Sequence, residues 1–73
     1  MRDLLLTSFG TRCKALRNDL GMSQEAFANS IDMDRSYYAS IETGMRNVTI
    51  RNMKKIAAGF EITLSELVED IDK

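Results

Sequence analysis

Apolar residues recur along this chain at spacings of three and four positions, which is the period of one face of an α-helix. β-branched residues never build the alternating run that a half-buried strand requires. The pattern therefore predicts an all-α fold. We expect five helices, at about residues 4–20, 23–30, 35–43, 49–59 and from 63 onward.

The ends of these helices carry local signals. Each of the last four helices has at its start a residue whose side-chain oxygen can accept a backbone N–H of the first turn: Ser23, Asp34, Thr49 and Thr63. Around each cap an apolar pair has the spacing of a hydrophobic staple, as Met22 and Phe27 do around Ser23. Gly21 and Gly44 are placed to end the first and third helices in the left-handed conformation.

The inward-facing positions of the helices predict one small core. They are Phe9, Cys13, Leu16 and Leu20 on the first helix, Phe27, Ala28 and Ile31 on the second, and Tyr38 and Ile41 on the third. Because Cys13 is the sole cysteine and histidine is absent, an internal disulfide and the usual zinc sites are excluded. We expect Cys13 to fill the core as a small apolar side chain, and we expect no metal and no cofactor.

The length of 73 residues gives room for a single domain, over residues 1–73. A core of this size is marginal alone, so a partner subunit that buries more apolar surface is expected. No apolar run approaches the roughly 18 residues of a membrane span, and the three leucines at 4–6 are too short for a signal peptide. The chain is therefore expected to be soluble and cytoplasmic, without a membrane partner.

The formal net charge of −1 hides an uneven distribution. Residues 1–60 carry nine basic and six acidic side chains, a balance of +3, whereas residues 61–73 carry one basic and five acidic, a balance of −4. Residues 35–55 alone hold five basic side chains and one acidic one. A basic segment beside an acidic end permits a polyanion on one side of the molecule, although charge runs are often solvated faces.

The second and third predicted helices are separated by three or four residues, which forces a sharp angle between them. Ala28 on the second helix is small enough to let the third approach closely. These features predict a helix-turn-helix over about residues 23–43. In that motif the first helix crosses the DNA backbone and the second lies in the major groove.

The stretch SQEAFANSIDMDRSYYASIETGMRN resembles the helix-turn-helix of the lambda-repressor-like (Cro/C1, or XRE) family. The shared residues are Ser23, Gln24, Glu25, Ala28, Ile41, Glu42 and Gly44, and the resemblance extends over roughly residues 5–68. It implies a compact five-helix DNA-binding domain. A narrower likeness, in DRSYYASIE and RNVTI, is to the controller proteins of restriction–modification systems. Asp32 stands where the family usually has glycine, at a position that tends to need a positive φ, which Asp tolerates.

The first turn of the third helix holds the residues expected to read DNA bases. Arg35 can donate bidentately to N7 and O6 of guanine, which is worth ~1–3 kcal/mol of discrimination. Ser36 is either a base or phosphate contact or a plain helix-start residue. Tyr38 aligns with Ile41 and is expected in the core, so its neighbour Tyr37 should point outward and contact a phosphate or a base step.

Other residues are expected to support this contact. Ala39 and Ser40 lie one turn further along and either touch DNA or, being small, allow close approach. The remaining phosphate contacts are expected from Gln24, Arg46, Asn47 and Arg51. Because an exposed carboxylate on this helix would repel DNA, Glu42 should fold back, and the resemblance implies a structural salt bridge with Arg17.

Relatives in this family bind as two-fold dimers, so the resemblance implies a homodimer on a near-palindromic operator of double-stranded DNA, with two dimers on adjacent sites as an extension. The expected dimerisation region is residues 60–71. Its apolar side chains are Phe60, Ile62, Leu64, Leu67, Val68 and Ile71, and the sequence does not divide them between core and interface.

The sequence thus predicts a DNA-binding transcription regulator, most like a restriction–modification controller that activates its own operon at low dose and represses it at high dose. Two alternatives stay open: a small prophage Cro/C1-type repressor, and an antitoxin-like interaction module that binds a partner through its acidic end. An enzyme is not expected, because histidine, metal-ligand spacing and a Gly-rich phosphate loop are all missing. No small-molecule ligand is expected either.

Overall fold

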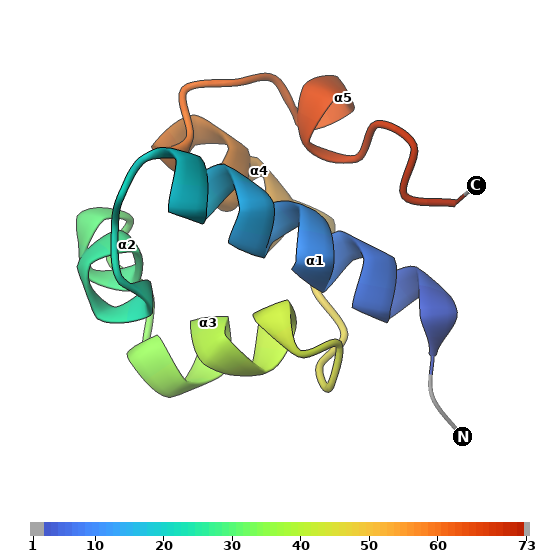
Figure 1. Cartoon of the computed structure of the whole chain (residues 1–73), viewed down its shortest axis with the longest axis horizontal. Coiled ribbons are helices and arrows are strands. Elements are labelled where there is room, and N and C mark those ends of the chain that lie inside the picture. The colour runs from blue at the N-terminus through green and yellow to red at the C-terminus, as the bar shows by residue number, and fades with distance from the viewer. Residues whose placement is uncertain (1–2, 73) are drawn as a thin grey trace.

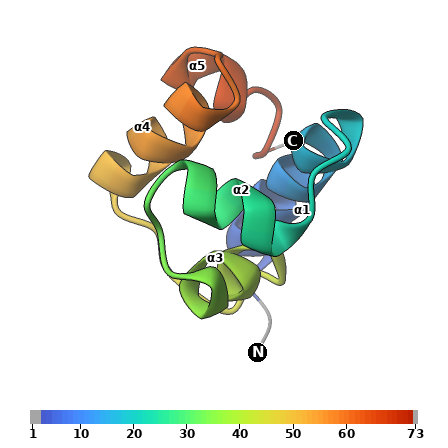
Figure 2. The same ribbon diagram turned by 90° about the vertical axis from the view of Figure 1, so that its left-hand side faces the viewer.

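The computed structural model describes residues 3–72, which form five α-helices and no strand. The helices are α1 (Leu4–Asp19), α2 (Gln24–Ser30), α3 (Arg35–Glu42), α4 (Ile50–Gly59) and α5 (Leu64–Leu67). The predicted all-α class is therefore confirmed. Helix α1 crosses the middle of the molecule, with α3 on one side and α4 and α5 on the other (Figure 1). Because α3 and α5 also lie at opposite ends of the second view, the two helices are well separated (Figure 2).

The four predicted N-caps are all present. The side chains of Ser23, Asp34, Thr49 and Thr63 each accept a backbone N–H from the first turn of the helix that follows. Thr63 also forms a full capping box with Glu66, and a backbone hydrogen bond from Thr63 lowers the pKa of that exposed carboxylate. Asp3, which the sequence did not single out, caps α1 by accepting the N–H groups of Leu5 and Leu6. Local chemistry therefore sets where the helices start.

One hydrophobic core joins α1, α2, α3, α4 and α5. At its centre the ring of Phe27 stacks on Phe60 with centroids 4.2 Å apart and meets the tilted ring of Tyr38 at 5.1 Å. Cys13 is fully buried, and burial raises the pKa of its thiol to about 12, which fits the expected role as a core filler. One predicted core position is wrong: Leu20 is 51% exposed, because α1 ends at Asp19 and Leu20 is its C-cap beyond the packed face.

Two glycines bring the end of α3 against α1. A Cβ at Gly10 would lie 2.4 Å from the carbonyl oxygen of Ile41 and 2.5 Å from that of Glu42, so the backbones of the two helices are in direct contact. Gly44, at a left-handed φ of 77°, likewise has no room for a Cβ, which would lie 2.8 Å from Cα of Thr7. These close approaches fix the orientation of α3 relative to α1.

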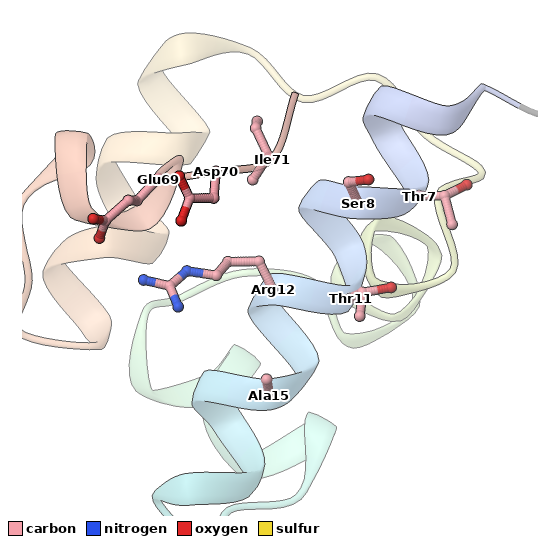
Figure 3. Close-up of a pocket in the computed structure, with 8 residues that line it drawn as sticks. All are labelled: Thr7, Ser8, Thr11, Arg12, Ala15, Glu69, Asp70 and Ile71. Carbon is pink, nitrogen blue, oxygen red and sulfur yellow. The ribbon is translucent and has the colours of Figure 1, made fainter. Parts of the chain in front are cut away.

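Arg12 on α1 contacts the acidic C-terminal segment, residues 61–72. One Nη of this side chain donates to the backbone oxygen of Glu66 at 2.8 Å. The guanidinium extends beneath Glu69 and Asp70 along a hollow of about 410 Å³ (Figure 3). Within residues 3–72 the buried Nε of Arg12 has no hydrogen-bond partner. The segment that follows α5 therefore stays on the α1 side of the molecule, away from α3.

Candidate nucleic-acid interface

Helices α2 and α3 are joined by a turn that brings them into contact. Ala28 is completely buried, and its carbonyl oxygen accepts the N–H of Met33 at 2.9 Å. Asp32 has the expected positive φ, 55°, and its carbonyl oxygen accepts a hydrogen bond from Lys55 at 3.0 Å. In the view toward α2, helix α3 lies directly below it at the edge of the molecule (Figure 2). The arrangement is the predicted helix-turn-helix.

Helix α3 has one buried face and one exposed face. Its buried side chains are Tyr38, Ile41 and Glu42. Arg35 and Ser36 are exposed on the first turn, and no ion pair between described residues involves Arg35. An N-terminal turn that projects an unpaired guanidinium and a hydroxyl into solvent can reach the edges of bases in a major groove.

In the second turn of α3 the side chains on this face are less exposed than those of the first turn. Ala39 and Ser40 are half-buried, and the Ser40 hydroxyl donates to the backbone oxygen of Tyr37 at 2.7 Å. That hydroxyl therefore already has an acceptor within its own helix. Its oxygen and the Ala39 methyl group are what this turn can present to a ligand.

Tyr37 is more enclosed than the sequence suggested. The expectation of an exposed ring is corrected: the ring is half-buried against the core, because the first turn of α4 covers its edge. Its hydroxyl oxygen accepts a hydrogen bond from Nδ2 of Asn52 at 3.0 Å. The Arg46 guanidinium lies over the ring, 5.5 Å from its centroid. Sequence reasoning missed Asn52, since no local pattern links it to a tyrosine 15 positions earlier.

The loop between α3 and α4 and the first turn of α4 bring more polar and basic groups to this side. Arg46, Asn47 and Arg51 are all exposed, as the predicted backbone contacts require. The acidic residues of the C-terminal segment lie with α5 at the opposite end of the molecule (Figure 1). The charge separation along the sequence is thus also a separation in space, which leaves α3 and its loop as the end suited to a polyanion.

Behind this face Arg17 and Glu42 form a buried ion pair. The guanidinium binds the carboxylate with two hydrogen bonds, Nε to Oε2 at 2.7 Å and Nη2 to Oε1 at 3.0 Å. Its third nitrogen donates to the backbone oxygen of Met22 at 2.8 Å. The pair joins α1 to α3 and gives Glu42 the structural position that the sequence indicated.

Gln24 belongs to the same network. Its amide nitrogen donates to Oε1 of Glu42 at 2.9 Å, so the side chain turns inward toward the ion pair. The sequence predicted a phosphate contact from this amide, and the structure shows that one of its hydrogens is already bound. Gln24 therefore holds the carboxylate in place from the α2 side.

The protonation of this network follows from its contacts. Burial acts to raise the pKa of Glu42, but favourable interactions with Arg17, Gln24 and the Tyr38 hydroxyl outweigh it and hold the pKa below its ordinary value. Burial, and then the neighbouring carboxylate, raise the pKa of the Tyr38 phenol. That hydroxyl has no partner with regular hydrogen-bond geometry among residues 3–72. At neutral pH the site contains a carboxylate, a guanidinium and a neutral phenol.

The predicted dimer residues divide into two groups. Phe60 is 8% exposed and Leu67 is completely buried. These two side chains belong to the core of the subunit, so we no longer assign them to the seam, the apolar surface through which two subunits are expected to pair. The other four are half-buried: Ile62, Leu64, Val68 and Ile71. Val68 and Ile71 line one wall of an apolar groove of about 310 Å³, whose other walls include Leu5 on α1 and Met53 on α4.

Among the residues that the structure describes, no helix is long and apolar enough to cross a membrane. The same residues contain no cluster of histidine, cysteine and carboxylate side chains that could hold a metal ion.

The chain resembles known proteins over most of its length. The Helix-turn-helix family model matches residues 14–67. The control protein C.MunI of a Mycoplasma species is 56% identical over 66 residues, which cover 89% of each protein. The crystal structure of the restriction–modification controller protein C.AhdI from Aeromonas hydrophila has a TM-score of 0.82 at 42% identity, covering 85% of this chain and 94% of that one.

A third relative was solved on DNA. The structure of the restriction–modification controller protein C.Esp1396I, a tetramer in complex with its natural 35-base-pair operator, has a TM-score of 0.83 at 32% identity and covers 99% of this chain and 100% of that one. These likenesses confirm the resemblance that the sequence motifs indicated. The chain belongs to the helix-turn-helix family and, within it, to the controller proteins of restriction–modification systems.

Proposed function

We propose that this protein is a homodimeric, sequence-specific DNA-binding regulator of transcription that controls its own restriction–modification operon. The observation that carries the proposal is the first turn of α3, where Arg35 and Ser36 are exposed, on a helix that lies on the other side of α1 from α5 (Figure 1). On this proposal the chain binds and does not catalyse, and it acts in the cytoplasm, where its operator lies.

Recognition of bases is assigned to α3. A major groove accepts one helix, and an arginine at its N-terminal turn can donate two hydrogen bonds to N7 and O6 of a guanine. Arg35 has the exposure for this contact. Ser36 beside it can bond a base edge or a phosphate, and the Ala39 methyl group can pack on the C5-methyl of a thymine.

Binding of the DNA backbone is assigned to residues around the α3–α4 loop. Arg46 and Asn47 lie on that loop and Arg51 follows on α4, all exposed. Contacts of this kind set the register of the protein on the duplex and carry most of the salt dependence. Gln24 has a smaller part, because its amide is already bound to Glu42.

Dimerisation is assigned to the apolar surface around residues 60–71. We infer a seam that includes Leu64, Val68 and Ile71 and continues into the groove beside Leu5, which is itself 51% exposed. A two-fold pair would present two copies of α3 about 34 Å apart and so require a near-palindromic operator. That C.Esp1396I is a tetramer on its operator supports two dimers on adjacent sites here. Filling of a first and then a second site would let one protein activate at low dose and repress at high dose.

A fluorescence anisotropy titration tests the proposal. The DNA upstream of the gene is compared with a scrambled duplex of equal length and composition at several salt concentrations. We expect the upstream DNA to bind at least about 10³-fold more tightly at physiological salt. Equal affinity for the two duplexes, or no binding at low salt, would contradict sequence-specific regulation.

A further inference from the structure

We propose that Asn52 on α4 is a positioning residue for DNA recognition: it holds the Tyr37 hydroxyl so that the hydroxyl proton is offered to an acceptor on DNA. The inference rests on the proposed function and adds to it a residue from outside the helix-turn-helix. It assigns Tyr37 a directional hydrogen bond to the duplex and makes α4 a determinant of specificity.

The geometry fixes Tyr37 on three sides. Its side chain packs against the hydrophobic core. The guanidinium of Arg46 lies over the ring at 5.5 Å from its centroid. Nδ2 of Asn52 donates to the hydroxyl oxygen at 3.0 Å. A half-buried tyrosine held in this way keeps one orientation and loses little conformational entropy on binding.

Asn52 is itself held by a capped helix turn. Its backbone N–H donates to Oγ1 of Thr49 at 3.1 Å, which places Asn52 at the third helical position of α4. The side chain is half-buried between α4 and Tyr37. The amide is therefore a rigid donor and reaches the phenol from a helix that is packed into the core through Ile56 and Ala57.

The chemistry of the phenol gives this contact a direction. A tyrosine hydroxyl has one proton and accepts through its oxygen lone pairs. Because the amide of Asn52 donates to the hydroxyl oxygen, the hydroxyl proton is available to a different acceptor, and the bond from Asn52 is the one hydrogen bond that this hydroxyl makes among residues 3–72. The acceptors on base edges in the major groove are suitable partners, so the contact should depend on the base pair. Arg46 above the ring brings a positive charge that favours such an acceptor.

Two rival roles for Asn52 predict different behaviour. If the side chain contacts a phosphate itself, its loss should weaken every duplex alike and should add to the effect of losing the Tyr37 hydroxyl. If it merely stabilises the fold, its loss should lower the melting temperature, and affinity should fall only with the folded fraction. A positioning role instead couples Asn52 to Tyr37 at particular base pairs.

The test is a double-mutant cycle read on a panel of operators. Wild type, Asn52→Ala, Tyr37→Phe and the double variant are titrated against the operator and against duplexes that each carry one changed base pair. Asn18→Ala, an exposed asparagine on α1, is the matched control. We expect each single variant to lose about tenfold in operator affinity, from two copies of one hydrogen bond per dimer, and both to lose discrimination at the same base pair. The double variant should be no weaker than either.

Each other outcome overturns the inference. Additive losses, a uniform loss on all duplexes, or a loss explained by the melting temperature would each remove the positioning role. An NMR spectrum of the free protein with labelled tyrosine rings adds a second readout, in which Asn52→Ala should shift Tyr37 more than Tyr38. If wild type binds its operator selectively and Asn52→Ala behaves like Asn18→Ala, the inference alone fails. If wild type shows no selectivity, the proposed function fails and the inference falls with it.

Discussion

Loss of the Glu42 carboxylate should destabilise the fold far more than loss of an exposed one. Glu42 and Arg17 are 7% and 8% exposed, so Glu42→Ala leaves a guanidinium in the interior without its anion. Breaking a buried pair in this way costs about 3–5 kcal/mol. A domain of 73 residues has roughly 4–11 kcal/mol of stability in total. The variant should therefore lose a large share of its stability, with a melting temperature lower by at least about 12 °C.

Urea denaturation followed by far-UV circular dichroism measures this effect, with protein concentration held constant because dimerisation contributes to stability. Glu25→Ala is the matched control, since Glu25 is exposed on the first turn of α2 and should cost less than about 1 kcal/mol. Replacing both partners, as Arg17→Met with Glu42→Leu, should recover most of the lost stability. If Glu42→Ala and Glu25→Ala lost similar amounts, the buried pair would not hold α1 to α3.

Three more predictions follow from the same geometry. Gly10→Ala should destabilise by about 3 kcal/mol or more although alanine favours helices, because its Cβ would meet the backbone of α3, which cannot move aside as a flexible side chain can. Gly21→Ala, which has open space and a φ of 70°, should lose about 1–2 kcal/mol in the same urea assay, and similar losses for the two variants would contradict the close contact. Arg35→Ala should flatten discrimination between operator variants, whereas Arg46→Ala should weaken all duplexes and reduce the log–log salt slope by about 2 per dimer; equal profiles for the two variants would refute the division of roles. Because the folded pKa of Glu42 lies below its ordinary value of 4.5, its contribution is present above that pH and is lost as the pH falls through the folded pKa. Glu42→Gln should accordingly lose less stability than wild type on acidification below pH 4.5, and a parallel loss would contradict the assignment.

Features of the fold that depend on neighbouring residues could be predicted from the sequence. The four N-caps and the left-handed turns at Gly21 and Gly44 are present because a cap or a glycine acts within one helical turn. The buried position of Tyr38 followed from its alignment with Ile41 on one helix face. The family motif added the Arg17–Glu42 pair, which joins positions 25 residues apart.

Features that depend on distant contacts could not be predicted in this way. Gly10 lies within a helix pattern, and the reason for it is the backbone of α3 more than 30 positions later. Tyr37 was expected to be exposed from its neighbour Tyr38, but α4 covers its edge through Asn52. The apolar run from Phe60 onward has no periodicity that separates core from seam, because α5 is only four residues long. In each case the deciding partner lies on another helix.

The central claim is that the first turn of α3 lies in the major groove of the operator with the Arg35 guanidinium against a guanine. Methylation interference tests it directly, because dimethyl sulfate places a methyl group on guanine N7, within the major groove. We expect N7 methylation at one guanine in each half-site to block wild type, and Arg35→Ala to lose that interference while remaining sensitive to the rest of the operator. Binding that is indifferent to N7 methylation, or the same interference pattern in the variant, would show that α3 does not read the groove through this residue.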